Sequence, residues 1–145
     1  MRTDAMRSFK TLALALALTT PAGAFAATLH KTPGCGCCED HAEHLRQNGI
    51  AVTSVESPDL DRLRAAHGVP EELVGCHMLE IDGYVVEGHV SARTIKRLLA
   101  ERPAVKGISM PGMPTGSPGM GGPKTEPFVI HSFGGADGQA VYEVE

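Results

Sequence analysis

The chain has 145 residues, of which 42% are hydrophobic and 21% charged, so it can bury the core of one domain of ordinary size. It contains no Trp, its aromatic content is 4%, and its formal net charge is −4. Base stacking on exposed rings and a basic binding stripe are therefore excluded, and we expect no nucleic-acid partner and no aromatic-lined sugar groove.

Residues 1–26 have the three parts of a secretory signal peptide. Basic residues precede a short apolar run over 11–18, and Ala24-Phe25-Ala26 fits the small-residue pattern of a cleavage site. The run is shorter than the roughly 20 residues that cross a bilayer as a helix. We expect cleavage after Ala26, or alternatively after Ala24, which leaves a mature protein in the periplasm without membrane association.

Residues 27–106 are predicted to form an α/β domain. The expected elements, in chain order, are a strand over 27–31, a helix over 39–48, a strand over 50–55, a helix from Ser57 to Gly68, a strand over 76–81, a strand over 84–90 and a helix after Ser91. Asp82-Gly83 is a strong signal for the hairpin between the last two strands. This βαβα–ββα order predicts a thioredoxin-like fold, whose usual active site lies between the first strand and the first helix. In that topology Cys76 would face the Cys cluster at this position.

Two segments follow the domain. Residues 107–123 hold six Gly and four Pro, a composition that favours a loop with no helix or strand. They also contain Met110, Met113 and Met120. Residues 124–145 have two apolar stretches around a Gly-rich turn and form a candidate hairpin, whose packing on the domain is not predicted.

Three of the four cysteines, Cys35, Cys37 and Cys38, stand within four residues, and the fourth is Cys76. A structural disulfide framework spreads cysteines along the chain to close long loops, so this clustering indicates a redox or metal centre. Cys35 and Cys38 have C-x-x-C spacing at a helix start, where backbone N–H groups stabilise a thiolate. The same pair could instead form a plain disulfide. Cys37 is one thiol more than a disulfide exchanger needs.

Imidazoles accompany these thiols. Cys37, His41 and His44 fall at i, i+4 and i+7, so they share one stripe of the predicted helix. His77 and His89 are further candidate ligands, although a regular strand would point His77 away from the face that carries its neighbour Cys76. His30, His67 and His131 belong to no motif, and we expect them to be ordinary structural residues.

Thiolates and imidazoles together make a soft-to-borderline metal site. Zinc sites commonly use two well-spaced ligand pairs, whereas this chain has one crowded Cys group and a lone Cys-His pair, so zinc is the less favoured alternative. Cu(I) prefers sulfur, accepts the thioethers of Met110 and Met113, and can be bridged by crowded sulfurs into a multinuclear centre. Copper is therefore the expected ligand.

Five motifs together resemble one known family, the CopG-type periplasmic copper proteins, a family known chiefly as an uncharacterised metal-binding domain. The resemblance covers residues 29–120, and its motifs are Cys35-Gly-Cys-Cys38, Gly75-Cys76-His77, Gly83-Tyr-Val-Val-Glu-Gly-His89-Val90, Ile95-Lys-Arg-Leu-Leu99 and the Gly/Pro/Met segment Pro111–Met120. It implies a thioredoxin-like fold, copper held by the four Cys with imidazoles nearby, and a role in copper resistance. The chain departs from the family pattern at Met78, where Thr is expected, and at Gly121, where an acid is expected.

Two hypotheses of function follow. The favoured one is a periplasmic copper-binding protein that sequesters or delivers Cu(I), with another periplasmic copper protein as a candidate partner. The alternative is a thioredoxin-like thiol–disulfide oxidoreductase that cycles Cys35 and Cys38, with thiol oxidation coupled to copper reduction as one variant. Cys37 and the Met segment favour the first hypothesis, and the C-x-x-C spacing favours the second.

Overall fold

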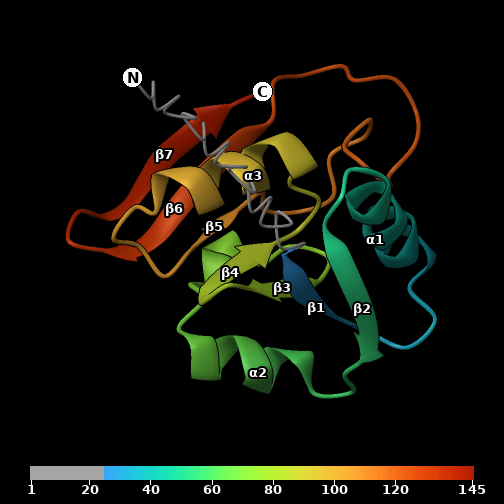
Figure 1. Ribbon diagram of the computed structural model, residues 1–145, viewed down its shortest axis with the longest axis horizontal. Coiled ribbons are helices and arrows are strands. Elements are labelled where there is room, and N and C mark those ends of the chain that lie inside the picture. The colour runs from blue at the N-terminus through green and yellow to red at the C-terminus, as the bar shows by residue number, and fades with distance from the viewer. Residues whose placement is uncertain (1–24) are drawn as a thin grey trace, which may run out of the picture.

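The computed structural model describes residues 25–145, so the predicted signal peptide lies outside the described residues except at its last two positions. The described chain is a mixed α/β structure built on one seven-stranded sheet, with the strand order β2-β1-β3-β4-β5-β6-β7 (Figure 1). The strands are β1 Ala26–Lys31, β2 Ala51–Glu56, β3 Met78–Ile81, β4 Tyr84–Glu87, β5 Gly107–Ser109, β6 Val129–Gly135 and β7 Gly138–Val144. The helices are α1 Gly36–Gln47, α2 Leu60–His67, the 3-10 helix η1 Glu71–Leu73 and α3 Ala92–Glu101.

The βαβα–ββα order predicted from the sequence is confirmed, and local signals explain it. The Asp59 carboxylate accepts a hydrogen bond from the Arg62 N–H at the start of α2, and the Ser91 hydroxyl accepts one from the Thr94 N–H at the start of α3. Asp82 and Gly83 have φ of 47° and 84°, the left-handed pair that a tight hairpin requires. The thioredoxin-like designation itself remains a prediction.

The expectation that residues 107–123 contain no strand was wrong. Gly107–Ser109 forms β5, which pairs parallel with β4 and antiparallel with β6. A Cβ atom at Gly107 would lie 2.1 Å from the Val85 carbonyl oxygen and 2.7 Å from the Phe133 ring. Glycine thus lets the neighbouring strand and the Phe133 ring approach closely at this point of the sheet, although composition alone marks the segment as a loop.

The candidate hairpin near the C-terminus is confirmed as β6 and β7, an antiparallel pair. Because β6 pairs with β5, the hairpin extends the same sheet. Its base is closed by backbone hydrogen bonds in both directions between Phe128 and Glu145. The residues after the predicted domain are therefore built into the sheet of that domain.

The two faces of the sheet bury different clusters. Leu29, opposite Leu79 in the β1–β3 register, belongs to the main core together with Leu45 of α1 and Ile95 of α3. The other face buries a smaller cluster under α2, consisting of Leu60, Leu73, Met78, Val85 and Phe133. Figure 1 shows α2 on one side of the central strands and α3 on the other. Among the described residues, no helix has the length and apolar character needed to span a membrane.

Candidate metal centre

The four cysteine sulfur atoms meet at one point of the fold. The Sγ atom of Cys76 lies 3.6 Å from that of Cys35, 3.5 Å from that of Cys37 and 3.4 Å from that of Cys38. Cys35 and Cys38 are joined by a disulfide, and Cys37 and Cys76 are free thiols. Cys38 is buried, while the other three are partly exposed. The sequence-based expectation that Cys76 meets the first Cys cluster is therefore confirmed.

Helix α1 presents three of these sulfurs at its first turn. It begins at Gly36, three residues earlier than predicted, so Cys35 is the N-cap residue and Cys37 and Cys38 lie inside the helix. No side chain caps this end. The positive end of the helix dipole and the first-turn N–H groups thus lie close to the sulfurs, an arrangement that is common at redox-active cysteines.

The strand β3 begins at Met78 and not at residue 76 as predicted. Cys76 therefore lies in the loop before β3 and reaches the cluster from there. The loop is packed backbone to backbone on the motif Glu87-Gly88-His89. A Cβ atom at Gly75 would lie 2.5 Å from the Gly88 Cα, and one at Gly88 would lie 2.3 Å from the Met110 carbonyl oxygen. Gly88 also has φ of 74°. Glycine at these two positions lets the chain segments approach closely enough to bring Cys76 beside His89.

A buried ion pair fixes the same loop. Glu87 is fully buried, and its carboxylate accepts hydrogen bonds from the Arg64 Nε, at 3.1 Å, and from the Gly75 N–H, at 3.0 Å. Arg64 also donates to the Gly75 carbonyl oxygen, at 2.9 Å, and to Asp61. Burial raises the pKa of Glu87, an effect that the hydrogen bonds from Arg64 and Gly75 oppose. The pair holds Gly75 by both its N–H and its carbonyl, and so positions the next residue, Cys76.

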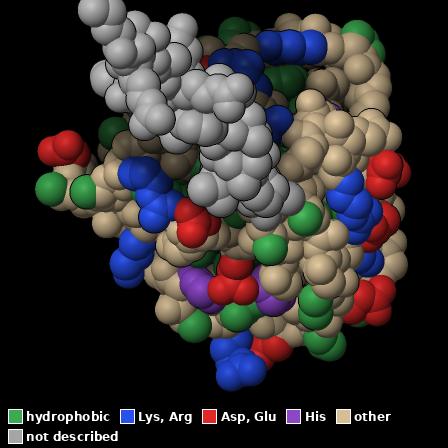
Figure 2. All heavy atoms as spheres, viewed as in Figure 1, with side chains coloured by type: hydrophobic (Ala, Val, Ile, Leu, Met, Phe, Trp, Pro, Cys, Tyr) green, Lys and Arg blue, Asp and Glu red, His purple; other side chains and the backbone are tan. Residues whose placement is uncertain are grey.

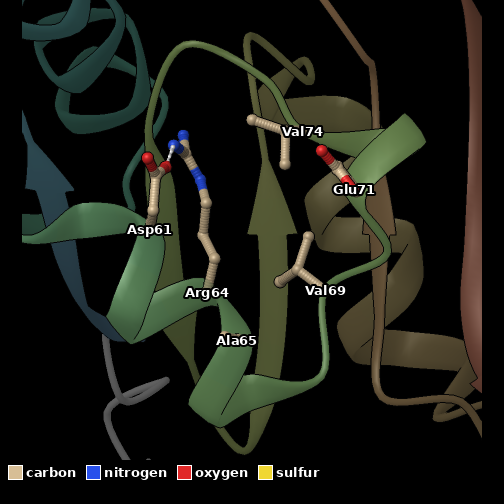
Figure 3. A pocket seen from close by; sticks show the side chains of 6 residues that line it. All are labelled: Asp61, Arg64, Ala65, Val69, Glu71 and Val74. Atoms are coloured by element: carbon tan, nitrogen blue, oxygen red, sulfur yellow. Dashed lines mark hydrogen bonds and ion pairs between the residues drawn. The ribbon is translucent and has the colours of Figure 1, made fainter.

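Figure 3 shows Arg64 and Asp61 at the edge of a hollow beside α2. Among the described residues, its lining consists of Asp61, Arg64, Ala65, Val69, Glu71 and Val74. None of these is a cysteine or a histidine, so no predicted metal ligand lines the hollow.

Three buried histidines, His41, His77 and His89, pack ring against ring beside the sulfurs. The His41 Nε2 lies 2.8 Å from the Val90 carbonyl oxygen, so this nitrogen carries the proton and donates it. The His41 Nδ1 lies 2.8 Å from the His77 Nε2 and must then accept a hydrogen bond from it. Burial lowers the pKa of His41 to about 3 and that of His77 well below its ordinary value, so both rings are neutral. This leaves the His77 Nδ1 with a free lone pair.

His89 is oriented in the same way by a different carbonyl. Its Nδ1 lies 2.7 Å from the Pro118 carbonyl oxygen and donates to it, so its Nε2 carries the lone pair. Burial also lowers the pKa of His89. Pro118 belongs to the Gly/Pro/Met segment, which Figure 1 shows passing close to α1. A Cβ atom at the next residue, Gly119, would lie 2.5 Å from the His41 backbone nitrogen, so this segment packs directly on the helix.

Within the described residues, two buried side-chain polar atoms lack a hydrogen-bond partner, the His77 Nδ1 and the His89 Nε2. These are the two nitrogens that carry the free lone pairs. One ring nitrogen of each histidine and the Cys76 Sγ lie within 4.8 Å of one another. A buried acceptor without a partner is costly and requires an explanation, and a metal ion supplies one. The donor set of this structure therefore fits a soft or borderline metal that binds both sulfur and imidazole.

The remaining predicted ligands lie elsewhere or have other contacts. The His44 Nε2 accepts a hydrogen bond from the Ala92 N–H at the start of α3, at 3.3 Å. Met110 is buried in the main core, and Met113 is 57% exposed. Met113 follows Gly112, which forms an isolated β-bridge with Gly75. The backbone at Met113 therefore runs beside the Cys76 loop. Sequence reasoning gave no role to Arg64 and Glu87, since nothing in the pattern signals an ion pair between residues 23 positions apart.

The fold and this site define a class of protein, a mixed α/β domain with a preformed thiol–imidazole cluster suited to a soft metal. Comparisons with known proteins identify the family. Residues 73–120 match the model of a family described as "Protein of unknown function, DUF411". Two solved structures titled "Copper resistance protein copG", Form 2 and Form 1, share 36% and 35% identity with the chain at a TM-score of 0.78. Each match covers 85% of this chain and 99% or 98% of the other. No curated protein sequence matches. The chain belongs to the CopG family of copper resistance proteins.

Proposed function

We propose that this protein binds Cu(I) in the periplasm, at a centre formed by Cys35, Cys37, Cys38 and Cys76, and thereby contributes to copper resistance. The single observation that carries the proposal is the convergence of four sulfur atoms within 4.8 Å of one another. Thiolates select Cu(I) over harder ions, and thiolates that lie this close together can each bridge two copper ions. The similarity to two copper resistance protein structures and the predicted signal peptide support copper as the metal and the periplasm as the location.

His77 and His89 complete the proposed centre. Their unpartnered nitrogens offer two imidazole ligands beside Cys76, with the tautomers already set by His41 and by the Pro118 carbonyl. Burial raises the pKa of the Cys76 thiol to about 11, with a further contribution from Cys37. Copper binding must therefore displace a proton from Cys76, which a coordinating metal ion does readily. Copper can be bound by all four cysteine thiolates only after the Cys35–Cys38 disulfide has been reduced.

That disulfide is the observation that favours the second function, a thiol–disulfide oxidoreductase. Oxidation of the Cys35 and Cys38 thiols to the disulfide releases two protons and two electrons. The two electrons can pass to another protein's disulfide, or they can reduce two Cu²⁺ ions to Cu⁺. Because this chemistry uses only the C-x-x-C pair, it does not need Cys37.

An anaerobic Cu(I) titration of the reduced protein, in competition with a Cu(I)-specific chelator, tests the proposal. We expect the wild-type protein to hold several Cu(I) ions and the Cys37→Ser variant to lose part of them. The His131→Gln variant serves as a control, because His131 lies on β6 and belongs to neither ligand group. A reduced protein that binds Zn²⁺ as tightly as Cu(I), or a Cys37→Ser variant with unchanged copper content, would contradict it. Insulin reduction that survives in Cys37→Ser would instead support the oxidoreductase.

A further inference from the structure

A second group of metal-binding side chains lies on the α2 face of the sheet, and none of its members belongs to the sulfur cluster. His30 comes from β1, Glu80 from β3 and His67 from the last turn of α2. Thr28 is opposite Glu80 in the β1–β3 register, so His30 lies diagonally across from Glu80 on the same face of the sheet. Three elements that are far apart in sequence thus bring two imidazoles and a carboxylate together.

The carboxylate holds both rings. The His30 Nε2 lies 2.7 Å from the Glu80 Oε2, and the His67 Nε2 lies 3.0 Å from the Glu80 Oε1. The side chains of His30, His67 and Glu80 are 15%, 32% and 39% exposed, so an ion from solution can reach them. Figure 2 shows histidine and acidic side chains side by side at the surface on the lower part of the viewed face.

Ser57 provides the support that a ligating histidine requires. The Ser57 Oγ lies 3.1 Å from the His30 Nδ1. A hydroxyl can either donate or accept a hydrogen bond. It can therefore accept the Nδ1 proton when the Nε2 of His30 gives its lone pair to a metal, and such a partner on the other ring nitrogen is typical of metal-binding histidines.

We propose that His30, His67 and Glu80 form a second metal site, which takes a divalent ion of the Zn²⁺ or Cu²⁺ type. Two imidazoles and one carboxylate are a known ligand set for zinc, and nitrogen–oxygen sets also suit Cu²⁺. The three side chains offer no sulfur, which disfavours Cu⁺, and the two imidazoles disfavour Mg²⁺ and Ca²⁺. Each ring moves its proton from Nε2 to Nδ1, so that both Nε2 lone pairs bind the ion and the rings turn towards one point between the carboxylate oxygens. Solvent occupies the remaining coordination position.

The site differs from the sulfur cluster in exposure and in chemistry, so it can be tested without reference to copper binding by the cysteines. The measurement is a Zn²⁺ titration of the full mature chain labelled with ¹⁵N-histidine, in which NMR follows each imidazole separately. We expect the Nε2 signals of His30 and His67 to shift together as one equivalent of Zn²⁺ binds beyond the amount that the cysteine centre takes up. Zinc bound by the cysteines would leave these two signals in place, so the two sites are distinguished within one experiment.

Two variants and one control complete the test. In the His67→Gln variant the His30 signal should need at least about tenfold more Zn²⁺ to shift, and Glu80→Gln should behave in the same way. In His131→Gln both signals should shift as in the wild type. The backbone spectrum of each variant confirms that it is folded. The proposal is overturned if His30 and His67 do not respond to Zn²⁺ in the folded wild-type protein, or if His30 in the two site variants responds at the same Zn²⁺ concentration as in the wild type.

Discussion

The protein contains two histidine clusters on different parts of the fold, and they differ in how each imidazole nitrogen is satisfied. In the buried cluster, His77 and His89 each keep one nitrogen without a partner beside Cys76. In the surface cluster, His30 and His67 are both satisfied by Glu80. Burial removes the water that would otherwise bond the free lone pairs, so the interior site is left incomplete without an ion. The surface site is already complete, and there an ion must displace an existing contact. We therefore expect tight binding at the first site and weaker, exchangeable binding at the second.

Removal of Cys76 should have the largest effect on this contrast. Its Sγ lies within 3.6 Å of all three other sulfurs and within 4.8 Å of the two imidazoles, so it joins the two halves of the buried centre. We expect Cys76→Ser to lower Cu(I) affinity by more than about 100-fold, since even residues outside the ligand set typically change metal affinity by 10–100-fold. Chelator competition measures the loss. Zn²⁺ binding at His30 and His67 should not change. A parallel loss of binding at both sites would contradict the view that the two sites are independent.

Removal of either buried imidazole should have the next largest effect. The variants His77→Gln and His89→Gln should each lower Cu(I) affinity by about 10–100-fold and leave fewer ions bound. His44→Gln is the matched control, because His44 lies on the same helix as His41 but bonds the Ala92 N–H at the start of α3. X-ray absorption at the copper edge should show nitrogen scattering that decreases in the first two variants only. An unchanged spectrum in His89→Gln would remove His89 from the centre, and unchanged spectra in both variants would confine the ligands to sulfur.

Loosening the segment that packs on α1 should have the smallest effect. Gly119 and Gly121 both have positive φ, 84° and 67°, but a Cβ atom at Gly119 meets the α1 backbone whereas one at Gly121 meets nothing within 4 Å. Both alanine variants are strained by about 1–3 kcal/mol. Gly119→Ala should lose a further amount on the order of 1–3 kcal/mol through the clash. Denaturant unfolding of the metal-free protein measures the difference. Equal stabilities would mean that the segment does not clamp α1, and hence that Pro118 does not fix His89.

Local patterns were sufficient to predict much of the fold. Caps such as Ser91, the Asp82-Gly83 turn and the alternation of apolar residues act within a few positions, so the sequence alone predicts the βαβα–ββα order and the terminal hairpin. The strand β5 was missed because its place in the sheet depends on Val85 and Phe133, which are distant in sequence and accept only a glycine between them. The cysteine cluster was predicted because three thiols within four residues need no tertiary structure to lie together.

The roles of the histidines show where sequence stops being informative. The amino-acid order alone determined that soft sulfur ligands gather at the start of α1. It could not determine that His77 and His89 offer lone pairs, because their tautomers depend on the Val90 and Pro118 carbonyls, reached only after folding. Nor could it single out His30 and His67, which belong to no motif and meet only through Glu80. Side chains far apart in the chain become neighbours when the sheet and helices pack, and the hydrogen bonds formed there decide which nitrogen remains free to bind a metal.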